Sequence, residues 1–295
     1  MNVPVLPPRS IGSLPTMHDL PSDHLEDPGL PDEFHGLQPQ ILSETLKLSG
    51  YTPMERFNAF DLNLYYDPNH TRWYKRPDWF LVVGTTRMYR GQSSLRSSYV
   101  VWDEGVAPIV VVEFLSPGTE SEDLGRFASK PIKPNPKSNQ PPGKFTVYEE
   151  ILKIPNYIVF DEATRRLWFF RLVNDRYQEQ PISITNPLLW IPELEVGLTL
   201  ERGEYRESLQ FWLRWCDASG NLFPTLEETT QAAKEAADAA DAAAQAADAS
   251  AQAAAAAAQA AIAQNRQAIV NLLATGMSPE HVAAAFGMAI DDLPT

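Results

Sequence analysis

The stretch Pro108–Leu115, PIVVVEFL, decides the fold of this chain. Its apolar residues follow one another without the alternation of a half-exposed strand, which is typical of a central strand covered on both faces. One carboxylate, Glu113, interrupts the apolar run. Burying an unpaired carboxylate costs on the order of several kcal/mol, because the ion loses its hydration. The strand therefore indicates the centre of a sheet and also carries a residue that needs a partner or a function.

Other short runs of apolar, β-branched and aromatic residues flank this strand between residues 58 and 215. Such runs, bounded by turn residues, are typical of strands. We expect strands at FDLNLYY (60–66), DWFLVVG (78–84), SYVVWD (98–103), NYIVFD (156–161) and RLWFFRL (166–172). The sequence thus predicts a mixed sheet flanked by helices, in the α/β or α+β class.

Between the strand expected at 108–115 and the strand expected at 156–161 lie a loop and a helix. The Pro- and Lys-rich segment 124–143 is typical of an inserted loop. KFTVYEEILKI (144–154) has helical periodicity. Its apolar face consists of Phe145, Tyr148, Ile151 and Leu152. Asp103 and Glu104 are expected to form the turn before the strand that begins at Pro108.

The two ends of the chain differ in composition from its middle. Residues 1–39 are expected to form a flexible arm, because residues 1–35 are rich in Pro, Asp and Ser. A short helix is expected at 40–50, at the start of a folded domain that extends to residue 228. Alanine dominates 229–275 and predicts one long helix, with polar positions recurring every three or four residues. A small helix, 279–288, is expected within the terminal segment 276–295.

Composition and charge exclude several classes of protein. The 295 residues include a single cysteine, Cys216, so neither a disulfide framework nor a cysteine zinc site can form within the chain. No apolar run has membrane-spanning length, and a reducing cytoplasm is expected. The formal charge of −14 divides into −5 for residues 1–50, −4 for 51–230 and −5 for 231–295, so the middle remains compatible with nucleic acid. The five histidines, His18, His24, His35, His70 and His281, show no metal-ligand spacing.

The residues that could carry chemistry are Asp78, Glu113 and Lys144. Two carboxylates at neighbouring strand ends can hold Mg²⁺, which takes oxygen ligands and keeps several waters. The backbone carbonyl of Phe114 could complete the protein ligands. Lys144, at the start of the expected helix, could orient or deprotonate a water, or stabilise charge in the transition state. Taken singly, Asp78 is more typical of a turn or a strand start, and Lys144 of a solvated helix surface. Glu113 is as typical of a sheet edge or an ion pair as of a functional site.

These residues lie in segments that resemble the Uma2 (DUF820) family, which is abundant in cyanobacteria. The resemblance covers residues 55–228, through LNLYYDP, RPDWFLVVG, VVWDEGVAPIVVVEFLSPGTESEDLG, PPGKFTVYEEILKIPNYIVFDEATRRLWFFRL and LRWCDASGNLFPTLEE. It implies the restriction-endonuclease-like fold of the PD-(D/E)XK superfamily, followed here by the alanine-rich helix. It also implies Asp78 and Glu113 as the two acidic residues of that superfamily.

The chain departs from the superfamily pattern at one position. The lysine expected two residues after the glutamate is replaced by Leu115, and Lys144 fits the relocated position seen in Uma2-like sequences. Asp123 and Tyr148 also match family positions and are possible accessory residues. The resemblance implies a Mg²⁺- or Mn²⁺-dependent endonuclease acting on DNA.

A second hypothesis remains open at this point. In it, the fold is an idle scaffold that binds a partner or self-associates as a homo-oligomer through its alanine-rich helix. The C-terminal helices have the spacing of a helix-turn-helix, but the second contains no Lys or Arg, and we do not predict DNA binding there.

Overall fold

A computed structural model describes residues 32–89, 95–116, 118–131, 140–183 and 187–294. The chain divides into two compact units, Met1–Thr225 and Leu226–Thr295. The predicted arm falls mostly on residues 1–31, which lie outside the described residues. The predicted α+β class, a mixed sheet flanked by helices with a long C-terminal helix, is confirmed.

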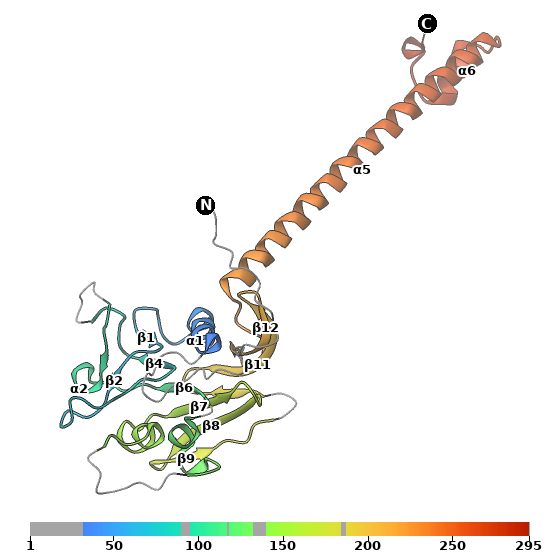
Figure 1. Ribbon diagram of the computed structural model, residues 1–295. Coiled ribbons are helices and arrows are strands. Elements are labelled where there is room, and N and C mark those ends of the chain that lie inside the picture. The colour runs from blue at the N-terminus through green and yellow to red at the C-terminus, as the bar shows by residue number, and fades with distance from the viewer. Residues whose placement is uncertain (1–31, 90–94, 117, 132–139, 184–186, 295) are drawn as a thin grey trace, which may run out of the picture. The chain divides into compact units, whose positions relative to one another are not determined.

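The main sheet of the first unit is mixed and has six strands (Figure 1). The β6 and β7 strands are parallel, and every other neighbouring pair is antiparallel. In spatial order the strands are β1 (Arg56–Ala59), β4 (Trp79–Val83), β6 (Val110–Phe114), β7 (Asn156–Asp161), β8 (Arg166–Val173) and β9 (Arg176–Glu179). The strands predicted within 78–84, 108–115, 156–161 and 166–172 are thereby confirmed.

Two predicted strands are shorter than expected. The segment 60–66 forms only β2 (Leu64–Tyr65), because the chain turns at Asp61, whose φ of 48° is left-handed. The segment 98–103 forms β5 (Tyr99–Val100) and then the helical turn α2 (Val101–Glu104). Asp103 and Glu104 therefore belong to a helix and not to the predicted turn. The strands β2, β5 and β3 (Tyr74–Lys75) make a separate small sheet.

The helix predicted at 40–50 is α1 (Glu33–Thr45), which begins well inside the predicted arm. The boundary at residue 40 is wrong, because Asp32 caps the helix by accepting a hydrogen bond from the His35 amide at 2.9 Å. The helix packs on β12 (Ser208–Cys216), where the Gln38 side chain both donates to and accepts from the backbone of Leu213. With β10 (Leu189–Ile191) and β11 (Val196–Tyr205), β12 forms a three-stranded antiparallel sheet.

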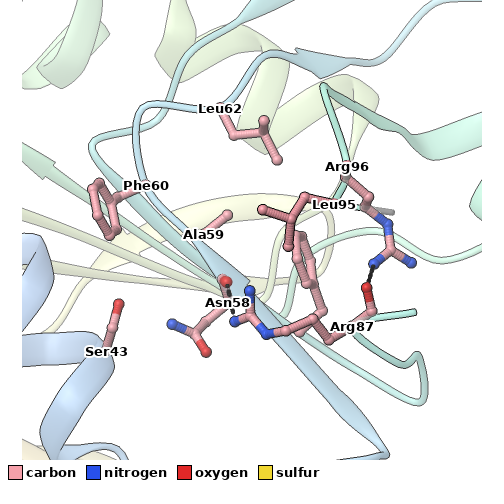
Figure 2. A pocket seen from close by; sticks show the side chains of 9 residues that line it. Ser43, Asn58, Ala59, Phe60, Leu62, Arg87, Leu95 and Arg96 are labelled. Atoms are coloured by element: carbon pink, nitrogen blue, oxygen red, sulfur yellow. Dashed lines mark hydrogen bonds between the residues drawn. The ribbon is translucent and has the colours of Figure 1, made fainter. Parts of the chain in front are cut away.

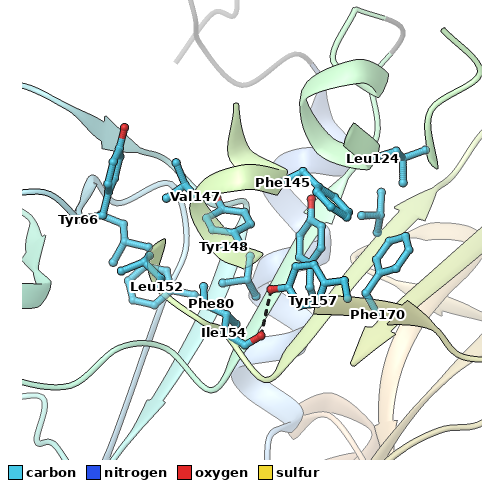
Figure 3. Packing of buried hydrophobic residues seen from close by; sticks show 14 of the residues in the cluster. Tyr66, Phe80, Leu124, Phe145, Val147, Tyr148, Leu152, Ile154, Tyr157 and Phe170 are labelled. Carbon is cyan, nitrogen blue, oxygen red and sulfur yellow. Dashed lines mark hydrogen bonds between the residues drawn. The ribbon is translucent and has the colours of Figure 1, made fainter. Parts of the chain in front are cut away.

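Alternate residues of β6 point into two different hydrophobic clusters. Val110, Val112 and Phe114 join a cluster that includes residues of α1 and of the sheet β10–β12. Val111 faces the opposite cluster, which is rich in aromatic rings such as Phe145, Tyr148, Tyr157 and Phe170 (Figure 3). Because side chains alternate along a strand, Glu113 shares the face of Val111. This face of the sheet is where the candidate site is built.

The helix predicted at 144–154 is confirmed in part. It begins as α4 (Lys144–Thr146) and continues as a π-helical turn, η3 (Val147–Ile151). The wider turn rotates the following residues, so that Val147 is buried and Ile151, predicted on the apolar face, is 42% exposed.

Cys216 is a buried free thiol.

The segment predicted as an inserted loop, 124–143, is partly helical. It includes the end of α3 (Glu120–Leu124) and the short helix η2 (Gly125–Phe127), while residues 132–139 lie outside the described residues. At Gly125, where φ is +51°, an added Cβ would lie 2.6 Å from the Phe145 ring. Glycine therefore permits the close packing of η2 against α4.

The second unit contains α5 (Leu226–Ala274), which confirms the predicted alanine-rich helix. Nearly all of its residues are exposed, and Ile269 is buried near its C-terminal end. After Gly276, whose φ is +88°, the chain forms α6 (Pro279–Phe286) and the short helix η4 (Ile290–Asp292). Among the helices that the structure describes, none has both the length and the apolar character needed to cross a membrane.

Candidate active site on the main sheet

The antiparallel pairing of β4 and β6 brings Asp78 and Glu113 together. Trp79 lies opposite Val112, so Asp78 stands next to Glu113 at the end of the pair. The Asp78 amide donates a hydrogen bond to Glu113 Oε2 at 3.2 Å. In return, the Phe114 amide donates to Asp78 Oδ2 at 2.6 Å. Two acids that are 35 residues apart in sequence thus lie side by side, because Asp78 bonds both to the Glu113 carboxylate and to the amide of the next residue, Phe114.

Lys144 reaches the same carboxylate from the start of α4. Its Nζ lies 3.0 Å from Glu113 Oε2 and 3.3 Å from Asp123 Oδ1. One helical turn later, the Tyr148 hydroxyl donates to Glu113 Oε1 at 2.7 Å. Glu113 is fully buried, so these contacts provide the partners that a carboxylate in an apolar strand requires.

Asp123, on α3, brings a third carboxylate to the cluster. It is fully buried, and its backbone carbonyl accepts a hydrogen bond from the Tyr157 hydroxyl at 2.8 Å. Within the described residues, neither carboxylate oxygen of Asp123 has a hydrogen-bond partner, although Lys144 forms an ion pair with Oδ1. The structure thus places every predicted side chain of the site, including the accessory Asp123 and Tyr148, in one cluster.

The charges in this cluster perturb one another strongly. Burial raises the pKa of Glu113 to about 7 and that of Asp123 to about 6, against the opposing effect of Lys144. Burial also raises the pKa of Asp78. The pKa of Lys144 is lowered by burial, but the three carboxylates raise it more, to well above its ordinary value. One ammonium therefore faces three carboxylates, and a further cation would be electrostatically favourable here.

The donor set suits a hard divalent cation. Within the part of the chain that the structure describes, no group of three or more His, Cys, Asp or Glu side chains is arranged to hold a metal ion. Mg²⁺ does not require such a group, because one or two carboxylates and several waters suffice. The neighbouring residues Asp78 and Glu113, together with Asp123, whose carboxylate oxygens have an ion pair with Lys144 but no hydrogen-bond partner, fit this requirement.

The backbone carbonyl of Phe114, the third predicted ligand, has a partner that the sequence did not reveal. His35 Nε2 lies 3.1 Å from this oxygen, and His35 Nδ1 lies 2.7 Å from Asp32 Oδ1. Spacing rules miss this histidine because its two partners are 3 and 79 residues away. A weak signal was present in Asp32, which is a typical helix cap three residues before His35.

A cavity of about 250 Å³ lies elsewhere on the first unit, beside β1 (Figure 2). Arg87 and Arg96 line it, but Arg87 donates to the Asn58 carbonyl and Arg96 forms a two-pronged ion pair with Glu104. None of the carboxylates of the cluster contributes to its lining. The cavity is therefore distinct from the candidate site.

The chain is similar to a family of known proteins and to a solved structure. The family model Uma2, described as "Putative restriction endonuclease", matches residues 15–202, which is more than half of the chain. A solved structure from Anabaena variabilis ATCC 29413, described as "a putative nuclease belonging to DUF820", is 10% identical with a TM-score of 0.37. That match covers 55% of this chain and 74% of the other. No match was found among the curated proteins.

Proposed function

The chain belongs to the Uma2 family, and from this premise we propose that it is a Mg²⁺- or Mn²⁺-dependent endonuclease that hydrolyses phosphodiester bonds in DNA. One observation carries the proposal. Glu113, a buried carboxylate in the central strand, lies within hydrogen-bonding distance of both the Asp78 backbone and the Lys144 ammonium. Perturbed acids paired with a cation are typical of catalytic sites.

The proposed ligands of the divalent ion are the carboxylates of Asp78 and Glu113 and the backbone carbonyl of Phe114. When bound, such an ion lowers the pKa of a coordinated water and neutralises charge on a phosphodiester. The chain's own contribution is to hold these oxygens at the ends of two paired strands. The hydrogen bonds between Asp78, Glu113 and the Phe114 amide fix their positions.

Lys144 is proposed to stabilise negative charge on the phosphate during hydrolysis. Its raised pKa keeps the amine protonated near neutral pH, so it acts as a cation and not as a base. Asp123 Oδ1 holds the ammonium from one side, and Glu113 Oε2 holds it from the other. Tyr148 in turn fixes the orientation of Glu113 through Oε1.

The test is cleavage of supercoiled and linear DNA by the purified chain with Mg²⁺ or Mn²⁺. Wild-type protein is expected to nick or cut the DNA, and the Glu113→Ala and Lys144→Met variants are expected to lose the activity. Identical cleavage by the wild type and Glu113→Ala would contradict the proposal. An RNA substrate of the same sequence tests the choice of DNA, because preferential cleavage of the RNA would overturn it.

The idle scaffold remains the alternative, favoured by the fact that Glu113 already has partners for both of its carboxylate oxygens. Calorimetry with Mn²⁺ separates the two hypotheses. Binding heat that disappears in Glu113→Gln supports the enzyme. The absence of binding heat in the wild type supports the scaffold.

A further inference from the structure

Arg166, the first residue of β8, lies at the same end of the main sheet as the candidate site. Across the sheet, Glu113 of β6 is opposite Val159 of β7, and Val159 is opposite Trp168 of β8. Residues that are opposite one another share a face of the sheet, and so do residues two apart on a strand. Arg166 and Trp168 therefore lie on the face of Glu113, two strand spacings or roughly 10 Å away.

The guanidinium of Arg166 forms no ion pair within the described residues. It is exposed, and it lies 4.4 Å from the centroid of the Trp168 ring. Asp161, which is opposite Arg166 on β7, has other partners. Its two carboxylate oxygens accept hydrogen bonds from the Thr164 amide at 3.3 Å and from the Thr164 hydroxyl at 2.6 Å. The positive charge of Arg166 is therefore not neutralised by its cross-strand neighbour.

Arginines farther from the site on the same part of the sheet do have carboxylate partners. Arg171, five residues later on β8, forms an ion pair with Glu193. Arg176 of β9 forms one with Glu150 at 3.2 Å. The chain has 38 acidic and 24 basic residues, so carboxylates are not scarce. An unpaired guanidinium at the end of the sheet that carries the acids therefore calls for a partner outside the chain.

The contact with Trp168 leaves Arg166 able to bind a phosphate. An aromatic ring contacts the flat face of a guanidinium, while the N–H donors point outward from its edge. Phosphate oxygens accept two such N–H groups in parallel. Trp168 is only 5% exposed, so the surface on which the guanidinium rests is fixed by the core.

The helix α3 connects Arg166 to the charged cluster. The pKa of Glu120, the first residue of α3, is lowered mainly by the hydrogen bond from the Ser129 amide, and also by the charges of Lys130 and Arg166. Asp123, which forms an ion pair with Lys144, lies one turn later on the same helix. Cationic side chains therefore follow α3 from the candidate site to the start of β8.

We propose that Arg166 binds a backbone phosphate of the DNA, within a few nucleotides of the phosphodiester held at the candidate site. This inference rests on the proposed function, because it adds a substrate contact on the same face of the sheet. A phosphate contact fixes the position of the strand and carries no sequence preference. Arg166 is therefore a positioning residue.

The test is the salt dependence of DNA binding by the full-length chain. Anisotropy of a fluorescent DNA duplex is measured over a series of KCl concentrations, with Glu113→Gln in every protein so that the DNA stays intact. Each phosphate contact contributes about −0.9 to the slope of log affinity against log salt concentration. Adding Arg166→Gln should make the slope less steep by about 0.9 and weaken binding by about eightfold at about 0.1 M salt, equally for unrelated DNA sequences.

Arg171→Gln is the matched control, because it removes the same charge from the same strand but from an arginine that is already ion-paired. Its slope should equal that of the Glu113→Gln parent. Arg166→Lys, which keeps the charge, should retain most of the slope. Should Arg166→Gln fail to fold, Arg166→Met provides the same test, because its unbranched side chain can still cover Trp168.

The outcomes separate this inference from the proposed function. Equal slopes for Arg166→Gln and Arg171→Gln overturn the role of Arg166 and leave the nuclease proposal standing. Weaker binding at an unchanged slope also overturns it, since the loss then comes from packing on Trp168. A less steep slope for Arg166→Gln, with no DNA cleavage by the wild type in Mg²⁺ or Mn²⁺, supports the phosphate contact and contradicts the nuclease. If the parent binds no DNA at any salt concentration, the phosphate contact is overturned.

Discussion

The two faces of β6 differ in what they bury. On one face, Val112 and Phe114 pack in an apolar cluster with residues of α1 and the second sheet. On the other, Glu113 stands among Lys144, Asp123 and Tyr148. One side of the strand therefore provides apolar burial alone, and the other combines the aromatic cluster with a cluster of charged side chains.

This difference separates stability from proposed chemistry within a single strand. Burial of apolar side chains stabilises the fold. Burial of several carboxylates around one lysine opposes it, because the loss of hydration is only partly offset by the ion pairs. Substitutions on the apolar face should therefore change mainly the free energy of unfolding, and substitutions in the charged cluster should change mainly DNA cleavage.

The largest expected effect is on activity, from Glu113→Gln. DNA cleavage should fall by at least about 10²-fold, because the proposed metal ligand and one of the two ion-pair partners of Lys144 are lost together. Above pH 7 the free energy of unfolding should stay the same or rise, because the buried charge is removed. Cleavage assays and thermal unfolding measure the two effects.

Glu149→Gln is the matched control for that substitution. Glu149 is equally buried, but it forms a two-pronged ion pair with Arg126 at 2.8 Å and accepts from the Tyr177 amide. This variant should lose stability and keep cleavage activity per folded molecule. If Glu149→Gln lost cleavage activity and Glu113→Gln lost only stability, the assignment of Glu113 to chemistry and of Glu149 to stability would be contradicted.

On the apolar face, Phe160→Ala should lower the free energy of unfolding by about 3 kcal/mol. Phe160 is fully buried on β7 and makes an edge contact with Phe34 of α1 at 5.8 Å between ring centroids. Chemical denaturation measures the loss, and Mn²⁺ affinity of the folded fraction should be unchanged. A change of less than about 1 kcal/mol would show that this face contributes little to stability.

The charged face should make stability depend on pH. The pKa values of Glu113 and Asp123 are raised in the folded chain, to about 7 and about 6, so the folded state binds protons that the unfolded state has released. The contribution of these two residues to the free energy of unfolding is most favourable below pH 4, and it is lost as the pH rises to 7. The free energy of unfolding measured between pH 4.5 and pH 7.5 should therefore fall more steeply in the wild type than in Glu113→Gln. Parallel curves would be evidence against the raised pKa of Glu113.

The smallest expected effect is that of Tyr148→Phe. The substitution removes the hydroxyl that donates to Glu113 Oε1 at 2.7 Å and leaves the ring in place. Stability should fall by about 1 kcal/mol, because a buried acceptor loses one partner. Cleavage should fall far less than in Glu113→Gln, and equal losses would indicate that Tyr148 has a direct role in the reaction.

Much of the cluster formed by Asp78, Glu113 and Lys144 could be predicted from the sequence. The uninterrupted apolar run before Glu113 specifies a central strand, and the strand at 78–84 is its neighbour, so the two acids meet. Lys144 could be placed through the family resemblance and the helical periodicity of 144–154, and the structure brings it to Glu113.

Other features depend on contacts that no local pattern records. The π-helical turn at Val147–Ile151 breaks the periodicity that placed Ile151 on the buried face. The start of α1 depends on packing against β12, which the sequence does not show, although Asp32 is a typical helix cap. His35 was missed for the same reason, since its position next to Phe114 is set by tertiary structure.

Lys144 reaches Glu113 from a helix and not from the strand that carries the glutamate. The number of residues between them is therefore not fixed by strand geometry. Relatives that gain or lose residues between the two positions can keep the same ion pair, and a search for a fixed glutamate-to-lysine interval will overlook them. Comparing such chains requires aligning the helix and the strand separately.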